Sequence, residues 1–126
     1  MRVISGNLRG TKLYTLEGQN TRPTLDRVKE SLFNIINPYV MDNNVLDLFA
    51  GTGSLGIECL SRGAHKCVFV DKSKESMAIV KSNIKKARVE NESTTLNIDF
   101  KSAVTSLGRQ GEKFTIIFMD PPYYKN

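Results

Sequence analysis

Long apolar runs are absent from this sequence of 126 residues. The longest apolar stretches are far shorter than the roughly 20 residues that a membrane-spanning helix needs. The first residues, MRVISGNLRG, contain no apolar segment followed by a cleavage site of the kind that secreted proteins carry. These two absences predict a cytoplasmic protein with no membrane partner.

Cysteine and histidine are scarce as well. The two cysteines, Cys59 and Cys67, have no CxxC spacing, and His65 is the one histidine. Because metal sites in proteins are built from clusters of such side chains, the sequence predicts no metal site. We expect both cysteines to be reduced packing residues and His65 to lie in a surface loop.

Internal repeats and low-complexity stretches are also missing. Hydrophobic residues make up 40% of the chain and charged residues 25%, which is ordinary for a soluble globular protein, and the length fits a single domain over residues 1–126. Eighteen Lys and Arg against thirteen Asp and Glu give a net charge of +5. This excess favours a polyanionic partner such as nucleic acid, although a solvated basic surface explains it equally well.

Residues 1–23 are predicted to form an N-terminal extension. In it, RVISG and TKLYTL flank the turn-like residues NLRG, a pattern typical of a hairpin. The next segment, TLDRVKESLFNII, predicts a helix, because its apolar residues recur at helical spacing. The predicted buried face of this helix consists of Leu25, Val28, Leu32, Phe33, Ile35 and Ile36.

From residue 45 on, short apolar runs alternate with helical patterns. Strands are predicted at VLDLFA, KCVFVD, TTLNID and FTIIFMD. Helices are predicted at SLGIECLSRG, at SKESMAIVKSNIKKARV and near Ser102 to Leu107. Strands that are apolar on both faces and alternate with helices indicate an α/β domain, a largely parallel sheet with helices on both faces.

A glycine-rich loop follows the first of these strands. Gly51-Thr52-Gly53-Ser54-Leu55-Gly56 fits the G-x-G-x-x-G pattern between a strand and a helix, where it binds nucleotides. Asp71 ends the next strand, where a carboxylate accepts hydrogen bonds from ribose hydroxyls, and NAD would fit both features. Asp47 lies four residues before Gly51, however, and its charge favours a ligand with an ammonium or sulfonium group, such as S-adenosylmethionine.

Aspartates lie at or near the ends of all the predicted strands: Asp47, Asp71, Asp99 and Asp120. In an open α/β sheet, ligands bind at the carboxyl ends of the strands. Taken singly, Asp99 fits a helix cap before FKSAV and Asp47 fits a brace for the glycine loop. Taken together, the four acids predict a ligand site.

The last predicted strand runs into Asp120-Pro121-Pro122-Tyr123. An exocyclic base amine is a poor nucleophile because its lone pair is delocalised into the ring. The Asp120 carboxylate and the Pro121 carbonyl, held rigid by the prolines, can accept hydrogen bonds from both N–H groups and aim the lone pair at an electrophilic methyl group. Tyr123 offers a face on which an unstacked base can stack. A stiff turn with an aromatic lid is the structural alternative.

These motifs together resemble class I S-adenosylmethionine-dependent methyltransferases, and more closely the bacterial RsmD family of small-subunit (16S) ribosomal RNA guanine-N2 methyltransferases. The matching stretches are RVISGNLRGTKL, TRPTLDRVKESLFNII, VLDLFAGTGSLGIECLSRGA, VFVDKS and DPPY. The resemblance implies a Rossmann-like fold, S-adenosylmethionine as cofactor, and methyl transfer to the exocyclic N2 of a guanine in ribosomal RNA or the small ribosomal subunit.

The resemblance also implies roles for single residues. Asp47, Gly51 and Gly53 would face the methionine portion of the cofactor, Asp71 the ribose and Asp99 the adenine amine. The full cofactor site is expected to comprise Asp47, Phe49, Gly51, Gly53, Asp71, Lys72, Asp99 and Phe100, and the catalytic site Asp120, Pro121, Pro122 and Tyr123. The RNA-binding face is expected to comprise Arg2, Arg9, Lys12, Arg22, Arg27 and Lys29.

Members of this family continue beyond the Asp-Pro-Pro-Tyr motif with elements that complete the sheet. We therefore expect a partial domain in these residues, with FTIIFM as an uncovered apolar edge strand. The expected state is a monomer that can self-associate through this edge, and turnover is expected to depend on the segment that completes the sheet.

Other functions stay open at this point. A DNA adenine-N6 methyltransferase would use the same motif, since the motif requires only an exocyclic amine. A non-catalytic module that binds S-adenosylmethionine or RNA would keep the cofactor fold without turnover, and a nicotinamide oxidoreductase would use the same glycine loop.

Overall fold

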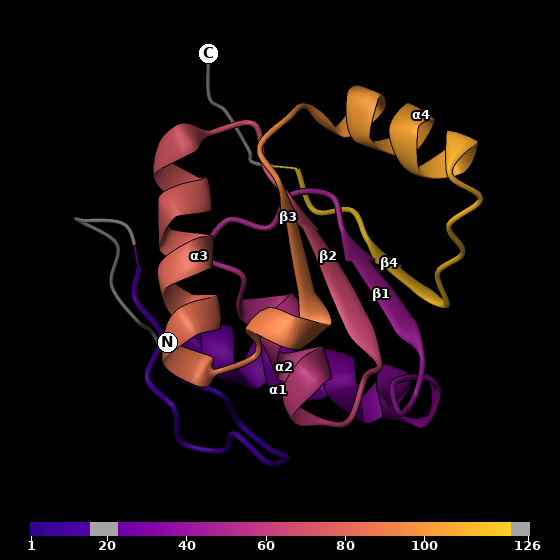
Figure 1. The fold of residues 1–126 in the computed structure, drawn as a ribbon. Helices are drawn as coiled ribbons and strands as arrows, with labels where there is room; N and C mark the ends of the chain where they lie inside the picture. The colour runs from indigo at the N-terminus through magenta and orange to yellow at the C-terminus, as the bar shows by residue number, and fades with distance from the viewer. Residues whose placement is uncertain (16–22, 122–126) are drawn as a thin grey trace.

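The computed structural model describes residues 1–15 and 23–121 (Figure 1). Its helices are α1 (Pro23–Ile36), α2 (Ser54–Ser61), α3 (Lys74–Ala87) and α4 (Phe100–Arg109), with the short 3₁₀ helices η1 (Asn37–Tyr39) and η2 (Glu90–Glu92). Its strands are β1 (Asn44–Asp47), β2 (Lys66–Val70), β3 (Ser93–Leu96) and β4 (Ile116–Phe118). Each predicted strand and helix from residue 45 on is present, and β4 is shorter than the apolar run that predicted it.

The strands form one parallel sheet in the order β3-β2-β1-β4. β1 pairs with both β2 and β4, so that Leu46 lies opposite Val68 on one side and Ile117 on the other. The chain therefore builds the sheet outward from β1 to β3 and then returns to place β4 on the other side of β1 (Figure 1). Such a reversal is a topological switch point, and ligands bind beside it at the carboxyl ends of the strands.

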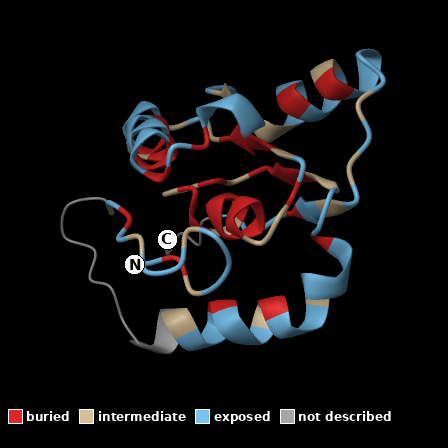
Figure 2. Cartoon of the chain, turned by 60° about the horizontal axis from the view of Figure 1, so that its bottom comes forward, coloured by how far each residue is buried: buried red, intermediate tan, exposed pale blue. Residues whose placement is uncertain are grey.

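Alternate residues of the strands belong to two different cores. Val45, Cys67 and Phe69 pack in the core shared with α1, α2 and α3, whereas Leu46 and Val68 pack in the core under α4. Figure 2 shows the buried residues in the sheet and on the helix faces turned toward it. The predicted α/β architecture is therefore confirmed, and Cys67 and Cys59 are free, buried cysteines, as expected.

The N-terminal extension is hairpin-like rather than a regular pair of strands. One antiparallel bridge joins Arg2 to Lys12. Around it, the Val3 amide donates to the Thr11 carbonyl and the Leu13 amide to the Met1 carbonyl. The side chains of Val3 and Leu13 are buried in the core with α1, α2 and α3, so the extension is part of the packed domain.

Helix α1 buries part of the predicted face: Phe33 is buried, and Leu32 and Ile36 are partly buried against the core, as expected. Val28 and Ile35 are 61% and 73% exposed, whereas Phe33 is fully buried and Lys29 is 5% exposed. The prediction was wrong at Val28 and Ile35 because it treated every apolar residue of the helix as an inward one. Lys29 takes an inward position because a buried carboxylate on α2 neutralises it, a partner that no helical periodicity reveals.

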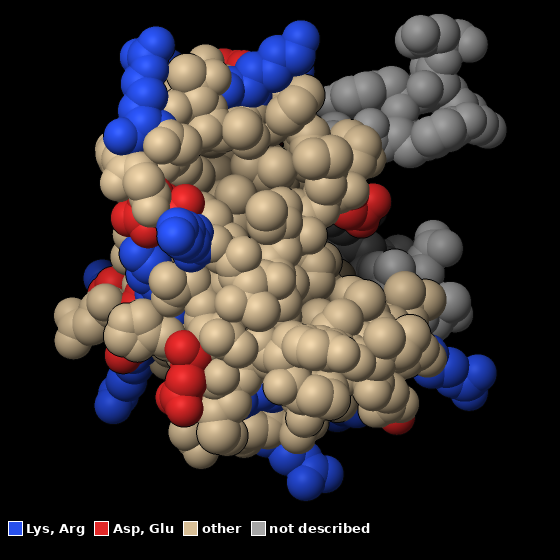
Figure 3. All heavy atoms as spheres, turned by 90° about the vertical axis from the view of Figure 1, so that its right-hand side faces the viewer, with Lys and Arg blue, Asp and Glu red and all other residues tan. Residues whose placement is uncertain are grey.

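β4 is an edge strand of the described sheet. Phe118 is buried in the core with α1, so Ile117, next to it, points to the opposite face and is 55% exposed. Met119, directly after β4, and Val104, on α4, are also exposed. Figure 3, which shows the molecule from this side, has its charged residues mainly around the margin of a broad uncharged surface. The predicted uncovered apolar edge is present.

Candidate active site

The glycine loop joins β1 to α2 and adopts the conformation that its glycines predict. Gly51 and Gly53 have φ angles of +62° and +85°, in the left-handed region that side chains disfavour. A Cβ atom on Gly56 would lie 2.4 Å from the Phe69 ring, so only glycine allows α2 to pack this closely on β2. A Cβ atom on Gly51 would meet no described atom within 4 Å, so the loop backbone there faces open space.

Asp71, directly after β2, ties the glycine loop to the start of α3. Its Oδ2 accepts a hydrogen bond of 2.9 Å from the Gly51 amide, and its Oδ1 accepts one of 2.9 Å from the Ser73 amide. The structure thus gives this acid a bracing role that the sequence analysis did not assign. An ionised carboxylate has about four acceptor sites, so two stay available to a ligand hydroxyl.

Asp47, the last residue of β1, is a buried carboxylate that is 2% exposed. Burial raises its pKa to about 7, and the charges of Asp71 and Asp120 act in the same direction, while a hydrogen bond from the Phe49 amide opposes them. Among the ion pairs of the described residues, none includes Asp47. A cationic ligand beside Asp47 would therefore supply a countercharge that the described residues do not.

Asp99 caps the N-terminus of α4. Its oxygens accept hydrogen bonds from the Ser102 amide at 3.2 Å and the Ser102 hydroxyl at 2.6 Å. These bonds hold the pKa of Asp99 below its ordinary value. The cap, one of the two interpretations of this residue, is therefore present, and contact with an adenine amine stays a prediction.

Phe49 and Phe100 form an aromatic pair next to this cap. Their ring centroids are 5.3 Å apart with an angle of 43° between the planes. Phe49 follows β1 and Phe100 begins α4, so the pair joins the glycine-loop side of the edge to the Asp99 side. Lys72 lies exposed between β2 and α3. The structure thus brings two of the predicted cofactor residues into direct contact.

Asp120 and Pro121 lie just beyond β4 and are exposed. Phe118 is paired in register with Asp47, so Asp120 follows that partner by two residues. The charge of Asp120 contributes to the raised pKa of Asp47, as expected for carboxylates at one edge of a sheet. Asp47 and Asp120 therefore flank the switch point between β1 and β4. Pro122 and Tyr123 lie outside the described residues.

Three of the predicted RNA-binding residues line one groove. Arg2, Lys12 and Arg27 line a groove between the N-terminal extension and α1, together with the acids Asp26 and Glu30. Arg9 is exposed in the turn of the extension, and Arg22 lies outside the described residues.

Lys29 does not belong to an RNA-binding face, and that prediction was wrong. Its Nζ lies 3.0 Å from Oε1 of Glu58 and donates hydrogen bonds of 2.9 Å to the Arg2 carbonyl and the Ser54 hydroxyl. Burial lowers the pKa of Lys29 and Glu58 opposes this. A phosphate could reach this ammonium only if those contacts broke.

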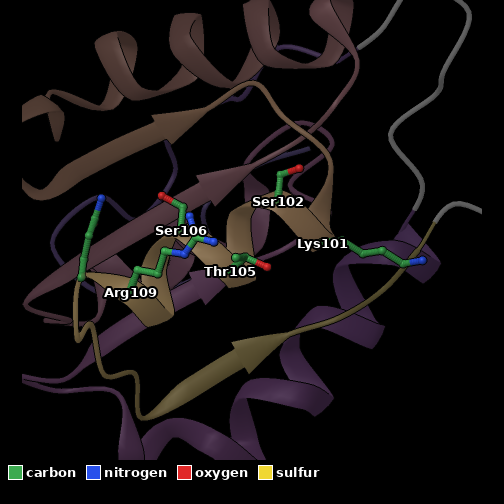
Figure 4. A pocket seen from close by; sticks show the side chains of 6 residues that line it. Lys101, Ser102, Thr105, Ser106 and Arg109 are labelled. Atoms are coloured by element: carbon green, nitrogen blue, oxygen red, sulfur yellow. The ribbon is translucent and has the colours of Figure 1, made fainter.

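A second groove runs along the exposed side of α4 (Figure 4). Its lining is polar and includes the cations of Lys101 and Arg109 with the hydroxyls of Ser102 and Thr105. Sequence analysis did not identify this surface, because a polar helix face is the ordinary solvent-facing pattern. In the described ranges, no helix is long and apolar enough to cross a bilayer, and no cluster of His, Cys, Asp and Glu is arranged to hold a metal ion.

The family model described as "Conserved hypothetical protein 95" matches residues 1–126. The chain belongs to this family. It is the RsmD family that the motifs indicated, since curated relatives across the whole chain carry the name ribosomal RNA small subunit methyltransferase D. The RsmD-family assignment made from the sequence is therefore confirmed.

Two curated relatives and one solved structure show how similar this chain is to known proteins. "Putative rRNA methyltransferase YlbH" of Bacillus subtilis is 46% identical over 98% of this chain and 67% of its own length. "Ribosomal RNA small subunit methyltransferase D" of Haemophilus influenzae is 37% identical over 100% of this chain and 65% of its own length. "Putative methyltransferase yhhF" of Escherichia coli has 34% identity and a TM-score of 0.82, over 99% of this chain and 66% of that one. This RsmD-family chain spans about two thirds of the length of these proteins.

Proposed function

We propose that this chain forms the cofactor-binding and target-orienting part of an S-adenosylmethionine-dependent methyltransferase that acts on the exocyclic N2 of a guanine in small-subunit ribosomal RNA. The observation that carries the proposal is the edge of the sheet at the switch point. There, the buried Asp47 at the end of β1 is followed by the glycine loop and is within electrostatic range of the exposed Asp120, and no cation of the described residues forms an ion pair with it.

The residues at this edge fit the cofactor. Asp47 supplies a carboxylate for a sulfonium or ammonium group, Gly51 supplies a backbone that faces open space, and Asp71 keeps acceptor sites for ribose hydroxyls. Gly53 supplies the second left-handed turn of the loop. The half-buried rings of Phe49 and Phe100 offer apolar surface for a purine. When bound, S-adenosylmethionine supplies the electrophilic methyl group.

The residues after β4 orient the target. The Asp120 carboxylate and the Pro121 carbonyl accept hydrogen bonds from the two N–H groups of a guanine amine, which turns its lone pair out of the ring plane. Holding the amine in this geometry lowers the entropic part of the barrier. Asp120 lies within electrostatic range of Asp47, so the oriented amine is placed near the charge that holds the cofactor. Pro122 and Tyr123 would complete this part of the site by stacking on the base.

RNA would contact the groove between the N-terminal extension and α1. Arg2, Lys12 and Arg27 reach it from both sides, and the net charge of +5 favours a polyanion over a neutral ligand. Phosphate contacts of this kind weaken steeply as salt concentration rises. Ribosomal RNA, free or in the small subunit, would be the partner, and the cytoplasm the place of action.

The first test is calorimetric titration of this chain with S-adenosylmethionine, S-adenosylhomocysteine and NAD. We expect the first two to bind and NAD not to bind, and Asp47→Ala to weaken binding. Preferential binding of NAD would revive the oxidoreductase and contradict the proposal.

The second test identifies the substrate. The chain, alone and extended by the C-terminal third of a family member, is incubated with unmodified small-subunit RNA, intact small subunits and protein-free DNA, and methylated nucleosides are identified by mass spectrometry. N2-methylguanine from RNA or subunits supports the proposal, and Asp120→Ala should abolish it while leaving cofactor binding intact. N6-methyladenine from DNA would show that the target is adenine in DNA and would contradict the proposed guanine target. No product with any substrate, despite cofactor binding, would indicate a non-catalytic module.

A further inference from the structure

Asn83 joins two parts of the molecule that are far apart in sequence. It lies on α3, and its side chain is fully buried. Its Oδ1 accepts a hydrogen bond of 2.6 Å from the Tyr14 amide, and its Nδ2 donates one of 3.0 Å to the Tyr14 carbonyl. The same Nδ2 donates a bond of 2.8 Å to the Thr52 carbonyl, between the two left-handed glycines of the glycine loop. One buried amide therefore fixes both the extension and the loop.

Lys29 makes a second link between the same two parts. Its ammonium donates to the Arg2 carbonyl in the extension and to the Ser54 hydroxyl, directly after Gly53. The glycine loop is thus held on both sides of Gly53, at Thr52 and at Ser54. Each of these two links also ends on the backbone of the extension, at Tyr14 or at Arg2.

The contacts that Ser61 makes with the extension do not touch the loop, unlike the contact of 3.7 Å between the Thr52 hydroxyl and the Met1 sulfur. The Ser61 hydroxyl on α2 accepts a hydrogen bond from the Leu8 amide and donates one to the Ser5 carbonyl. These bonds dock the turn of the extension on α2. They provide an internal control, because they contribute to docking of the extension but not to the conformation of the loop.

We propose that Asn83 is a positioning residue that couples cofactor binding at the glycine loop to docking of the N-terminal extension. When Tyr14 leaves Asn83, the buried side-chain amide loses two of its three hydrogen bonds. The Thr52 carbonyl is then no longer held in one place. A cofactor that requires the ordered loop therefore favours the docked extension, and the docked extension favours the cofactor to the same degree.

This coupling has a consequence for the order of events at the site. The extension supplies Arg2 and Lys12 to the groove assigned to RNA, so a polyanion that holds the extension in its docked state raises the affinity for the cofactor. This inference rests on the proposed function for the identity of the two ligands. The contacts themselves require only that a ligand binds at the glycine loop.

The test compares Asn83→Ala with the control Ser61→Ala by calorimetry with S-adenosylmethionine. We expect Asn83→Ala to weaken binding by about fivefold or more, the lower end of typical coupling between sites. Ser61→Ala should stay within about twofold of the wild type, although it also removes two hydrogen bonds of the extension. Equal losses in the two variants would overturn the inference, because they would reflect general loss of stability.

Amide hydrogen exchange of the unmodified chain provides the measurement that needs no variant. Saturating cofactor should slow exchange at the Tyr14 amide, which bonds to Asn83, more than at the Leu8 amide, which bonds to Ser61. Equal slowing at both amides, or none at Tyr14, would overturn the inference while leaving the proposed function intact. Absence of any cofactor binding to the wild type would instead contradict the proposed function.

Discussion

Two carboxylates are buried in the part of the chain that the structure describes, and their surroundings are opposite. Glu58 on α2 is fully buried and lies within ion-pair distance of two cations, Lys29 at 3.0 Å and Arg62 at 2.8 Å. Asp47 at the end of β1 is 2% exposed, and among the described residues its charged neighbours are the carboxylates of Asp71 and Asp120 and its hydrogen-bond donor is the Phe49 amide. The first acid is neutralised inside the fold, and the second is not neutralised by any ion pair of the described residues.

The pKa values of the two acids express this difference. Burial alone would raise the pKa of Glu58, but the Ile4 amide, Lys29 and Arg62 together lower it below its ordinary value. Burial raises the pKa of Asp47 to about 7, with Asp71 and Asp120 adding to the effect. A buried acid whose pKa is lowered by the protein's own cations stabilises the fold, whereas one whose pKa is raised at a sheet edge is a candidate for binding chemistry.

The largest effect is expected from Glu58→Gln. Oε1 of Glu58 accepts from the Ile4 amide and Lys29, and Oε2 accepts from the Ser5 amide and Arg62, so a glutamine amide would face donors in either orientation. The ammonium of Lys29 would then be buried without a countercharge. We expect a loss of about 3–5 kcal/mol in the free energy of unfolding, measured with urea.

Glu112→Gln is the matched control for this variant. Glu112 pairs with Lys66 at 2.9 Å, but about 30% of each side chain is exposed, so the loss should be below about 1 kcal/mol. Similar losses in the two variants would show that burial does not determine how much the Glu58 network contributes to the free energy of unfolding.

Asp47→Asn tests the other acid through the pH dependence of stability. Because the folded-state pKa is above the unfolded value, protonated Asp47 favours folding most below about pH 4, and this contribution is lost as the pH rises toward 7. Asparagine does not ionise, so the variant does not lose this contribution. Its free energy of unfolding relative to the wild type should therefore increase between pH 4 and pH 7, by up to about 4 kcal/mol, and stay constant above pH 7. Denaturant titrations at a series of pH values measure this.

Glu58 gives the opposite slope, which sharpens the comparison. Its folded-state pKa is lowered, so its contribution is present above about pH 4.5, the ordinary value, and is lost as the pH falls through the folded pKa. If Asp47→Asn and Glu58→Gln changed the pH dependence in the same direction, the distinction between a structural and a binding carboxylate would fail.

Cofactor affinity should also depend on the protonation of Asp47. A sulfonium or ammonium group favours the carboxylate form, so binding near pH 7 should release a proton, and affinity should rise with pH up to about 7 and then level off. The limit is about tenfold per pH unit if only the charged form binds. Calorimetry in buffers of different ionisation enthalpy detects the released proton. A pH-independent affinity would mean that the cationic group does not lie beside Asp47.

The sequence predicted well which acids lie at the ends of the strands, around Asp47. Asp47, Asp71, Asp99 and Asp120 follow short apolar runs, and parallel strands bring the carboxyl ends of such runs to one edge whatever the details of packing. The glycine loop was predictable for a similar reason, since its function depends on backbone geometry that only glycine adopts easily.

The helix α1 and the hairpin-like extension were predicted, but the buried polar contacts between them and the rest of the domain were not. The pattern of α1 placed Lys29 among exposed cations, but its position is decided by Glu58, 29 residues further along the chain. Asn83 gave no signal either, because its three hydrogen bonds go to the backbone at Tyr14 and Thr52, and the backbone carries no sequence information. A charged residue within the apolar run SLGIECLS was the one available hint, since a buried acid requires a partner.

Of the variants in the Glu58 network, Arg62→Lys should have the smallest effect, because it keeps the charge beside Glu58 and changes only its shape. The Arg62 guanidinium also lies 4.6 Å from the centre of the Phe33 ring and donates to the Asn37 side chain. Lysine retains the ion pair and loses the planar stacking and the second donor, so we expect a loss of about 1 kcal/mol. Arg62→Met, which removes the charge, should cost more. An equal cost for both would mean that Arg62 acts through contact with Phe33, and that Lys29 alone neutralises Glu58.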